Sequence, residues 1–102
     1  MTRYIVRTAS ETEHEVWQQG GYWKINFKGK DRFIAMLVSS DGSSFVHFNE
    51  INKDSFAGKI VVSPRNDRAP NYNSKEKKGL ELGWNSGLFP RTNVVTAIRE
   101  KN

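Results

Sequence analysis

The chain has 102 residues, a net charge of +5 and no cysteine. This length suits one domain, residues 1–102, with a single hydrophobic core. The missing cysteines exclude disulfides, thiolate metal sites and a cysteine nucleophile. Residues 1–50 hold six basic and six acidic side chains, whereas residues 51–102 hold ten and five, so the whole excess lies in the second half. A one-sided basic excess predicts a polyanionic partner, and solubility alone is the alternative.

The sequence shows no segment that would direct it to a membrane. The longest apolar run, residues 33–38, is far shorter than a membrane span. Residues 1–16 alternate polar and apolar side chains and lack the apolar centre of a signal peptide. We therefore expect a cytoplasmic protein without a membrane partner. The sequence does not indicate an oligomeric state.

The first half of the chain has the alternation of short strands. Residues 3–8 alternate and predict a strand. Residues 10–21 allow two interpretations: a capping box at Ser10 and Glu13 favours a helix over 11–18, whereas Gly20-Gly21 favours a strand through 14–18 that turns there. We favour the strand. Residues 22–28 form the clearest strand of the chain.

The next elements complete a predicted meander. Residues 32–39 are apolar on both faces from 33 to 38, which predicts a central strand after a turn at residues 29–31. Asp41-Gly42 predicts a tight turn, followed by a strand over residues 44–49. Residues 51–57 are predicted to connect two strands and can include one helical turn. Residues 59–63 predict a short strand that Pro64 ends.

The second half is dominated by a basic segment. Residues 64–78 show no apolar periodicity and contain two prolines and five basic residues, so we predict a long loop of the kind that often carries function. Residues 80–84 and 88–89 predict two short strands. Residues 94–99 fit a strand or a helix capped by Thr92, and the β-branched pair Val94-Val95 favours the strand.

Together these elements predict an all-β domain. We expect a small, strongly curved antiparallel sheet or barrel of six to eight strands, SH3-like or OB-like, with room for one short helix. The spacing of the large aromatic residues is that of inward positions. The predicted aromatic core is Trp23, Phe27, Phe33, Phe48, Trp84 and Phe89.

The segment Gly79–Ile98, GLELGWNSGLFPRTNVVTAI, resembles the C-terminal part of an SH3 domain. Glu81-Leu82, the run Gly87–Pro90 and a valine shortly after the proline follow the closing pattern of that family. The resemblance covers about a fifth of the chain and implies a small β-barrel. Members that bind proline-rich peptides have a tryptophan near the position of Lys78 and a tyrosine near that of Asn93. Because both are absent, the resemblance does not imply peptide binding.

Few residues suggest catalysis or metal binding. The only histidines are His14 and His47, and His47 with Glu50 and Arg65 suggests at most a small ribonuclease site. A histidine among phenylalanines usually packs or faces solvent, so we assign no catalytic residue. Three glutamates stand at alternate positions: Glu11, Glu13 and Glu15. On a strand they would share one face, where they could bind a cation or, as we expect, simply face solvent. We expect no cofactor and no metal.

Basic and aromatic side chains favour nucleic-acid binding. One face of the strand over 22–28 carries Tyr22, Lys24 and Lys28, and a neighbouring strand can add Arg32. A sheet face of this kind binds single strands of RNA or DNA by stacking and phosphate contacts. The predicted site is Tyr22, Lys24, Lys28, Arg32, Arg65, Arg68, Tyr72, Lys75, Lys77 and Lys78.

Two other functions stay open at this point. The basic half can dock on an acidic protein surface, which makes the chain an interaction module. Such a module is an SH3-like adaptor, or an accessory protein of a virus or mobile element that blocks a host complex. The third hypothesis is the small ribonuclease centred on His47.

Overall fold

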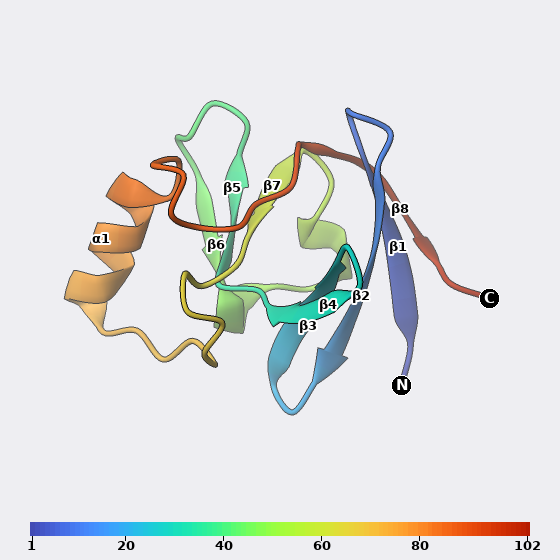
Figure 1. Ribbon diagram of the computed structural model, residues 1–102, viewed down its shortest axis with the longest axis horizontal. Coiled ribbons are helices and arrows are strands. Elements are labelled where there is room, and N and C mark those ends of the chain that lie inside the picture. The colour runs from blue at the N-terminus through green and yellow to red at the C-terminus, as the bar shows by residue number, and fades with distance from the viewer.

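Eight strands in two antiparallel sheets and one helix make up the fold in the computed structural model, which describes all of residues 1–102 (Figure 1). The five-stranded sheet has the order β4 (Lys30–Phe33), β3 (Tyr22–Phe27), β2 (Glu13–Gln19), β1 (Arg3–Thr8) and β8 (Val95–Glu100). The three-stranded sheet has the order β6 (Phe45–His47), β5 (Met36–Ser39) and β7 (Lys59–Val62). Two 3-10 turns, Phe48–Glu50 and Lys53–Ser55, follow β6, and helix α1 covers Ser74–Gly83.

The strand alternative for the residues after Ser10 is confirmed. Gln19 pairs with Tyr22 across a two-residue turn, and the turn residues Gly20 and Gly21 have φ of 60° and 84°. Positive φ at both positions is the geometry of the type I′ hairpin, which matches the twist of the flanking strands and favours glycine. The turn therefore fixes the register of β2 against β3.

The main core lies between the two sheets. The inner side chains of β1, β2 and β3 meet those of β5 and β7, with Phe56 filling the space between them. Period two places the core residues of each strand on one face, and residues between the strands, such as Phe56, complete the core. The buried members are Val6, Val16, Trp23, Ile25, Ile34, Leu37, Ile51, Phe56, Val61 and Val95.

The central strand predicted within residues 32–39 is confirmed for β5, which is covered on both faces. Leu37 faces the main core, whereas Met36 and Val38 pack with Leu80 of α1 in a second cluster. The prediction of one continuous strand was wrong, because β4 ends at Phe33 and β5 begins at Met36. At this break the chain passes from one sheet to the other.

A long loop over residues 64–78 and a strand over residues 80–84 were predicted, and from residue 74 onward this prediction was wrong. Residues 74–83 form α1 and not the end of a loop followed by a strand. The side chain of Asn73 accepts a hydrogen bond from the Glu76 N–H at 2.9 Å and caps the helix. Leu80 is buried but Leu82 is 74% exposed, so the residues follow the helical period. Residues 88–89 form no strand, whereas the strand predicted near the C-terminus is present as β8.

The mostly β fold with one short helix is thus confirmed, but the two sheets share no strand and do not close into a barrel. The predicted aromatic core is also only partly correct. Trp23 is buried, and the other five aromatic residues assigned to the core are half-buried: Phe27, Phe33, Phe48, Trp84 and Phe89. Phe27, Phe33 and Phe48 are therefore partly accessible at the surface.

Candidate nucleic-acid interface

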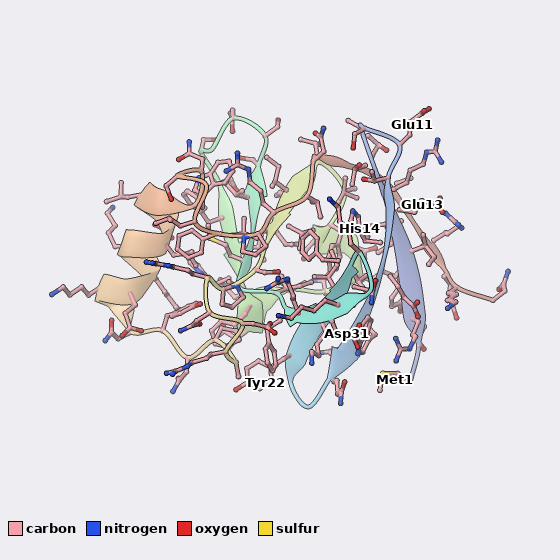
Figure 2. The ribbon with its side chains drawn as sticks, viewed as in Figure 1. Met1, Glu11, Glu13, His14, Tyr22 and Asp31 are labelled. Atoms are coloured by element: carbon pink, nitrogen blue, oxygen red, sulfur yellow. The ribbon has the colours of Figure 1, made fainter.

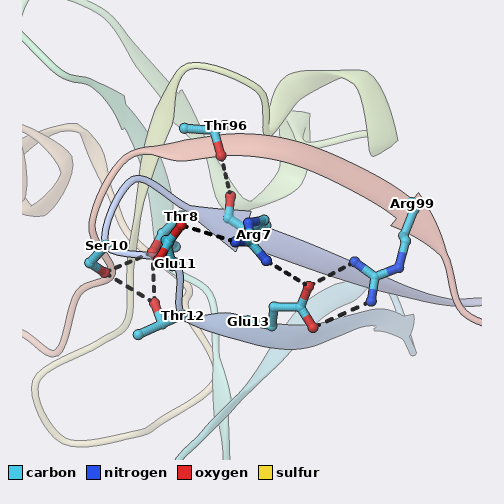
Figure 3. A network of polar contacts seen from close by, with 8 residues as sticks. All are labelled: Arg7, Thr8, Ser10, Glu11, Thr12, Glu13, Thr96 and Arg99. Carbon is cyan, nitrogen blue, oxygen red and sulfur yellow. Dashed lines mark hydrogen bonds and ion pairs between the residues drawn. The ribbon is translucent and has the colours of Figure 1, made fainter.

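Side chains on the outer face of β1, β2 and β8 form a network of ion pairs (Figure 3). Glu13 lies between Arg99, at 2.9 Å, and Arg7, at 3.7 Å. The hydrogen bond from Arg99 holds the pKa of the Glu13 carboxyl below its usual range. Glu15 similarly contacts Arg3 and Lys101 at 3.2 and 3.1 Å. The basic side chains of this face are therefore neutralised within it.

The other twelve of the sixteen lysines and arginines have no carboxylate within ion-pair distance. They belong mainly to the β3–β4 hairpin, the loop after β7 and helix α1. Unpaired cations raise the local potential and attract polyanions. These residues are Lys24, Lys28, Lys30, Arg32, Lys53, Lys59, Arg65, Arg68, Lys75, Lys77, Lys78 and Arg91.

Four aromatic side chains form a continuous strip beside some of these cations. The ring of Tyr22, labelled in Figure 2, meets the edge of Phe33 at 5.5 Å and stacks on Phe48 at 5.9 Å. Phe48 in turn meets Tyr72 edge-on at 6.3 Å. All four rings are half-buried. We call Phe33, Tyr22, Phe48 and Tyr72 the aromatic strip.

The register of the β3–β4 hairpin explains one end of the strip. Tyr22 and Lys24 share the outer face of β3, and Lys24 pairs with Phe33 of β4. The Lys24 ammonium lies 4.5 Å from the centre of the Phe33 ring, which is a cation–π distance. The strip therefore carries a positive charge held against an aromatic ring.

The loop after β7, which carries two exposed arginines, is bound to the strand at one end of the strip. The backbone N–H of Phe33 donates to Asp67 Oδ1 at 3.2 Å, which fixes the loop against β4. Arg65 and Arg68 flank Asp67 and are exposed. Further along the loop, burial and the charge of Glu76 raise the pKa of the Tyr72 phenol. Tyr72 therefore stays neutral at ordinary pH and presents an uncharged ring.

The structure brings together half of the predicted site residues. Tyr22 and Tyr72 belong to the strip, Lys24 lies on it, and Arg65 and Arg68 lie beside Asp67, which is bound to it. The other five lie elsewhere. Three are on α1 and not in a loop: Lys75, Lys77 and Lys78.

The placement of Arg32 on the same face as Tyr22 was wrong. Arg32 pairs with Ile25, whose side chain is in the core, so Arg32 lies on the opposite face of β4. Phe33 takes the outer position instead. Lys28 lies in the hairpin turn, where its φ is 49°. Lys28 and Arg32 therefore belong to a separate region of the surface.

Sequence reasoning missed the roles of Phe33 and Phe48, which it assigned to the core. A two-residue turn at Lys28-Gly29 would have placed Phe33 opposite Lys24, and the glycine at position 29 was the sequence signal for that turn. Phe48 carried no local signal, because its neighbours in the strip are distant in sequence.

The two histidines do not form a pair. His47 is 7% exposed, and its Nε2 lies 2.7 Å from Glu81 Oε2 of α1. His14 is in the other sheet, where its Nδ1 lies 3.1 Å from the carbonyl oxygen of Asn26. Because His47 is enclosed and already bound, this geometry gives the ribonuclease hypothesis no support.

The bond between His47 and Glu81 instead joins β6 to α1. We expect Glu81→Ala to destabilise the protein by about 1–3 kcal/mol, because it leaves a buried polar group without its partner. Urea denaturation and the exchange rates of the α1 amides measure this. Glu100→Ala is the matched control, because Glu100 is exposed and has no ion pair. Equal stability of the two variants would contradict the prediction.

The chain was compared with protein-family models, with curated proteins and with solved structures, and no match was found. The function must therefore be inferred from the residues and their geometry. The one helix of the fold, α1, has ten residues, and no helix present has the length and apolar character needed to cross a bilayer.

Proposed function

We propose that this protein binds single-stranded nucleic acid, RNA or DNA, along the aromatic strip. The observation that supports this most is the contact between the strip and Lys24, which has no carboxylate partner, with two further unpaired arginines in the loop that is bound to the strip. Lys24 lies on the ring of Phe33, and Arg65 and Arg68 flank the residue that binds the Phe33 N–H. Aromatic rings beside cations are the combination that binds bases by stacking and the backbone by charge.

The spacing of the rings favours an extended strand. Neighbouring rings of the strip lie 5.5–6.3 Å apart. A stacked strand advances roughly 3.4 Å per nucleotide, so bases that meet successive rings must be splayed apart. A duplex offers only its phosphates to such a surface, because its bases are stacked and paired. We therefore expect preference for single strands and little reading of sequence.

Fluorescence anisotropy with labelled single-stranded RNA, single-stranded DNA and duplex DNA tests the proposal. Three phosphate contacts predict a slope of about −2 in log affinity against log salt, since each contributes about −0.7 for single strands. Affinity should then fall about 20-fold between about 50 mM and about 200 mM salt. If no strand binds at the lower concentration, the proposal is wrong. An acidic protein partner would then be sought in nuclease-treated lysate.

The variant Tyr22→Ala tests the stacking part of the proposal. A base stacked on an aromatic ring contributes about 1–3 kcal/mol, so we expect about 5- to 150-fold weaker binding of single strands. Binding of duplexes should change little. Tyr22→Phe is the matched control and should keep the affinity, because it keeps the ring. An equal loss for single strands and duplexes would show that Tyr22 does not stack on a base.

The SH3-like or OB-like barrel stays a prediction from the sequence. The segment that resembles SH3 domains, Gly79–Ile98, contains the end of α1, an irregular stretch and most of β8. Two separate sheets lie where a barrel has one closed sheet. The proposed function therefore rests on the strip and its cations and not on the resemblance.

A further inference from the structure

A depression lies on the opposite side of β4 from the strip. It has a volume of about 490 Å³ and is formed by the tip of the β1–β2 hairpin, the β3–β4 hairpin and residues 90–93. This volume is in the range of small-ligand sites. We call it the cationic cleft, and the lining residues that matter here are His14, Phe27, Lys28, Arg32, Arg91 and Asn93.

The cleft has three cations and no carboxylate in its lining. Arg32 points to this side because it pairs with the core residue Ile25. Its neighbour Asp31 is turned to the other face, where its Oδ1 accepts a hydrogen bond from Asn26 at 2.8 Å. Lys28, Arg32 and Arg91 all lack an ion-pair partner. Like charges in one cleft repel, so a bound anion would lower the free energy of this arrangement.

Two of the three cations carry the argument. Lys28 also borders a depression on the outer face that includes Glu13 and Glu15, so its charge is shared between two sites. The Arg91 guanidinium lies over the Trp84 ring at 5.6 Å and donates one long bond, 3.5 Å, to the Trp84 carbonyl. This contact holds one side of the Arg91 guanidinium against Trp84, which does not line the cleft, and leaves its other N–H groups without a partner. The Arg32 side chain forms no ion pair and no cation–π contact.

The remaining lining residues suit the phosphate and the base of a nucleotide. Asn93 Oδ1 accepts the Val94 N–H at 2.7 Å, so the Asn93 NH₂ group is left as a donor. The rings of His14 and Phe27 lie 5.3 Å apart in the same cleft and offer a stacking surface. Guanidinium forks and amide donors match the oxygens of a terminal phosphate, which carries up to two negative charges.

We propose that the cationic cleft binds a phosphomonoester, either a free mononucleotide or the phosphorylated end of a nucleic-acid strand. The ligand contacts Arg32, Arg91 and Asn93 through its phosphate and His14 and Phe27 through its base. The site lies beyond the aromatic strip and does not depend on the strip. The cleft binds a mononucleotide whether or not a strand occupies the strip.

Amide chemical shifts of the labelled protein measure this binding. Adenosine monophosphate, uridine monophosphate and inorganic phosphate are titrated in turn, with adenosine as the uncharged control. We expect the mononucleotides to shift signals of residues 28–32 and 90–93, and adenosine to leave them unchanged. No response to any phosphate, or an equal response to adenosine, would overturn the proposal.

The source of the phosphate is distinguished with oligonucleotides. Anisotropy compares one sequence with a 5′-phosphate, a 3′-phosphate and neither. A gain in affinity from either phosphate supports the end of a strand as ligand, whereas binding of the mononucleotide without such a gain supports the free nucleotide. Absence of both effects overturns the proposal.

The double variant Arg32→Gln, Arg91→Gln should weaken mononucleotide binding about tenfold or more, because it removes charge-assisted hydrogen bonds. The control variant Arg65→Gln, Arg68→Gln makes the same change in charge beside the strip and should leave mononucleotide binding unchanged. This control variant should instead lower the affinity for strands without a terminal phosphate. The experiments therefore test the cleft and the strip independently.

If the variant Arg32→Gln, Arg91→Gln does not fold, Arg91→Gln alone replaces it, since Arg91 is exposed. Unchanged affinity in a folded variant would refute the site.

Discussion

Glutamine in place of Lys24, Arg65 and Arg68 should weaken the binding of single strands about 100-fold at about 0.1 M salt. Each phosphate contact on a single strand contributes about 0.7 to the slope of log affinity against log salt, so three contacts give about two powers of ten at this concentration. The slope itself should fall from about −2 to near zero. Anisotropy at several salt concentrations measures both quantities with one labelled oligonucleotide.

A matched control distinguishes the strip from general positive charge. Glutamine at Lys75, Lys77 and Lys78 removes the same charge from α1, whose N-terminal cap Asn73 directly follows Tyr72. These lysines were predicted to contact nucleic acid and lie on α1, which is well separated from β3 and β4 (Figure 1). We expect a smaller loss of affinity than for the strip variant, similar for all sequences. Equal losses would mean that the strand follows the net charge and not the strip.

The sequence predicts most of the first half correctly because its evidence there is local. Alternation of apolar and polar residues defines β1 and β3, and the glycine pair after β2 fixes a hairpin. The second half misleads because Leu80, Leu82 and Trp84 alternate as they would in a strand. Only the cap at Asn73 distinguishes the helix, and it lies in a stretch without other helical pattern.

The candidate site shows how small errors of register change a functional prediction. Moving the β3–β4 turn from residues 29–31 to Lys28-Gly29 exchanges Arg32 and Phe33 between the faces of β4. That exchange moves one arginine to the cationic cleft and one aromatic ring to the strip. The contact of Phe48 with Tyr72 joins a 3-10 turn to a distant loop, and no local pattern in the sequence encodes it.

Trp23 connects the core to the proposed interface. It lies between Tyr22 and Lys24 on β3 but faces inward, and it is 4% exposed. Its ring meets the edge of Phe56 at 5.2 Å, and its indole N–H donates to the Ile51 carbonyl at 3.1 Å. These contacts hold the segment after β6, which includes Phe48, against the five-stranded sheet. A change at Trp23 should therefore affect both stability and the shape of the strip.

We expect Trp23→Ala to destabilise the protein by about 3–5 kcal/mol, because it removes a large buried ring and leaves a cavity. A domain of this size has a net stability of about 5–15 kcal/mol, so the loss is a large part of the total. Urea denaturation followed by circular dichroism measures it. Trp23→Phe is the matched control: it keeps most of the ring and loses the bond to Ile51, which should cost less. A loss below about 1 kcal/mol for Trp23→Ala would show that the segment carrying Phe48 is held by other contacts. The strip would then keep its geometry, and its affinity for single strands, without Trp23.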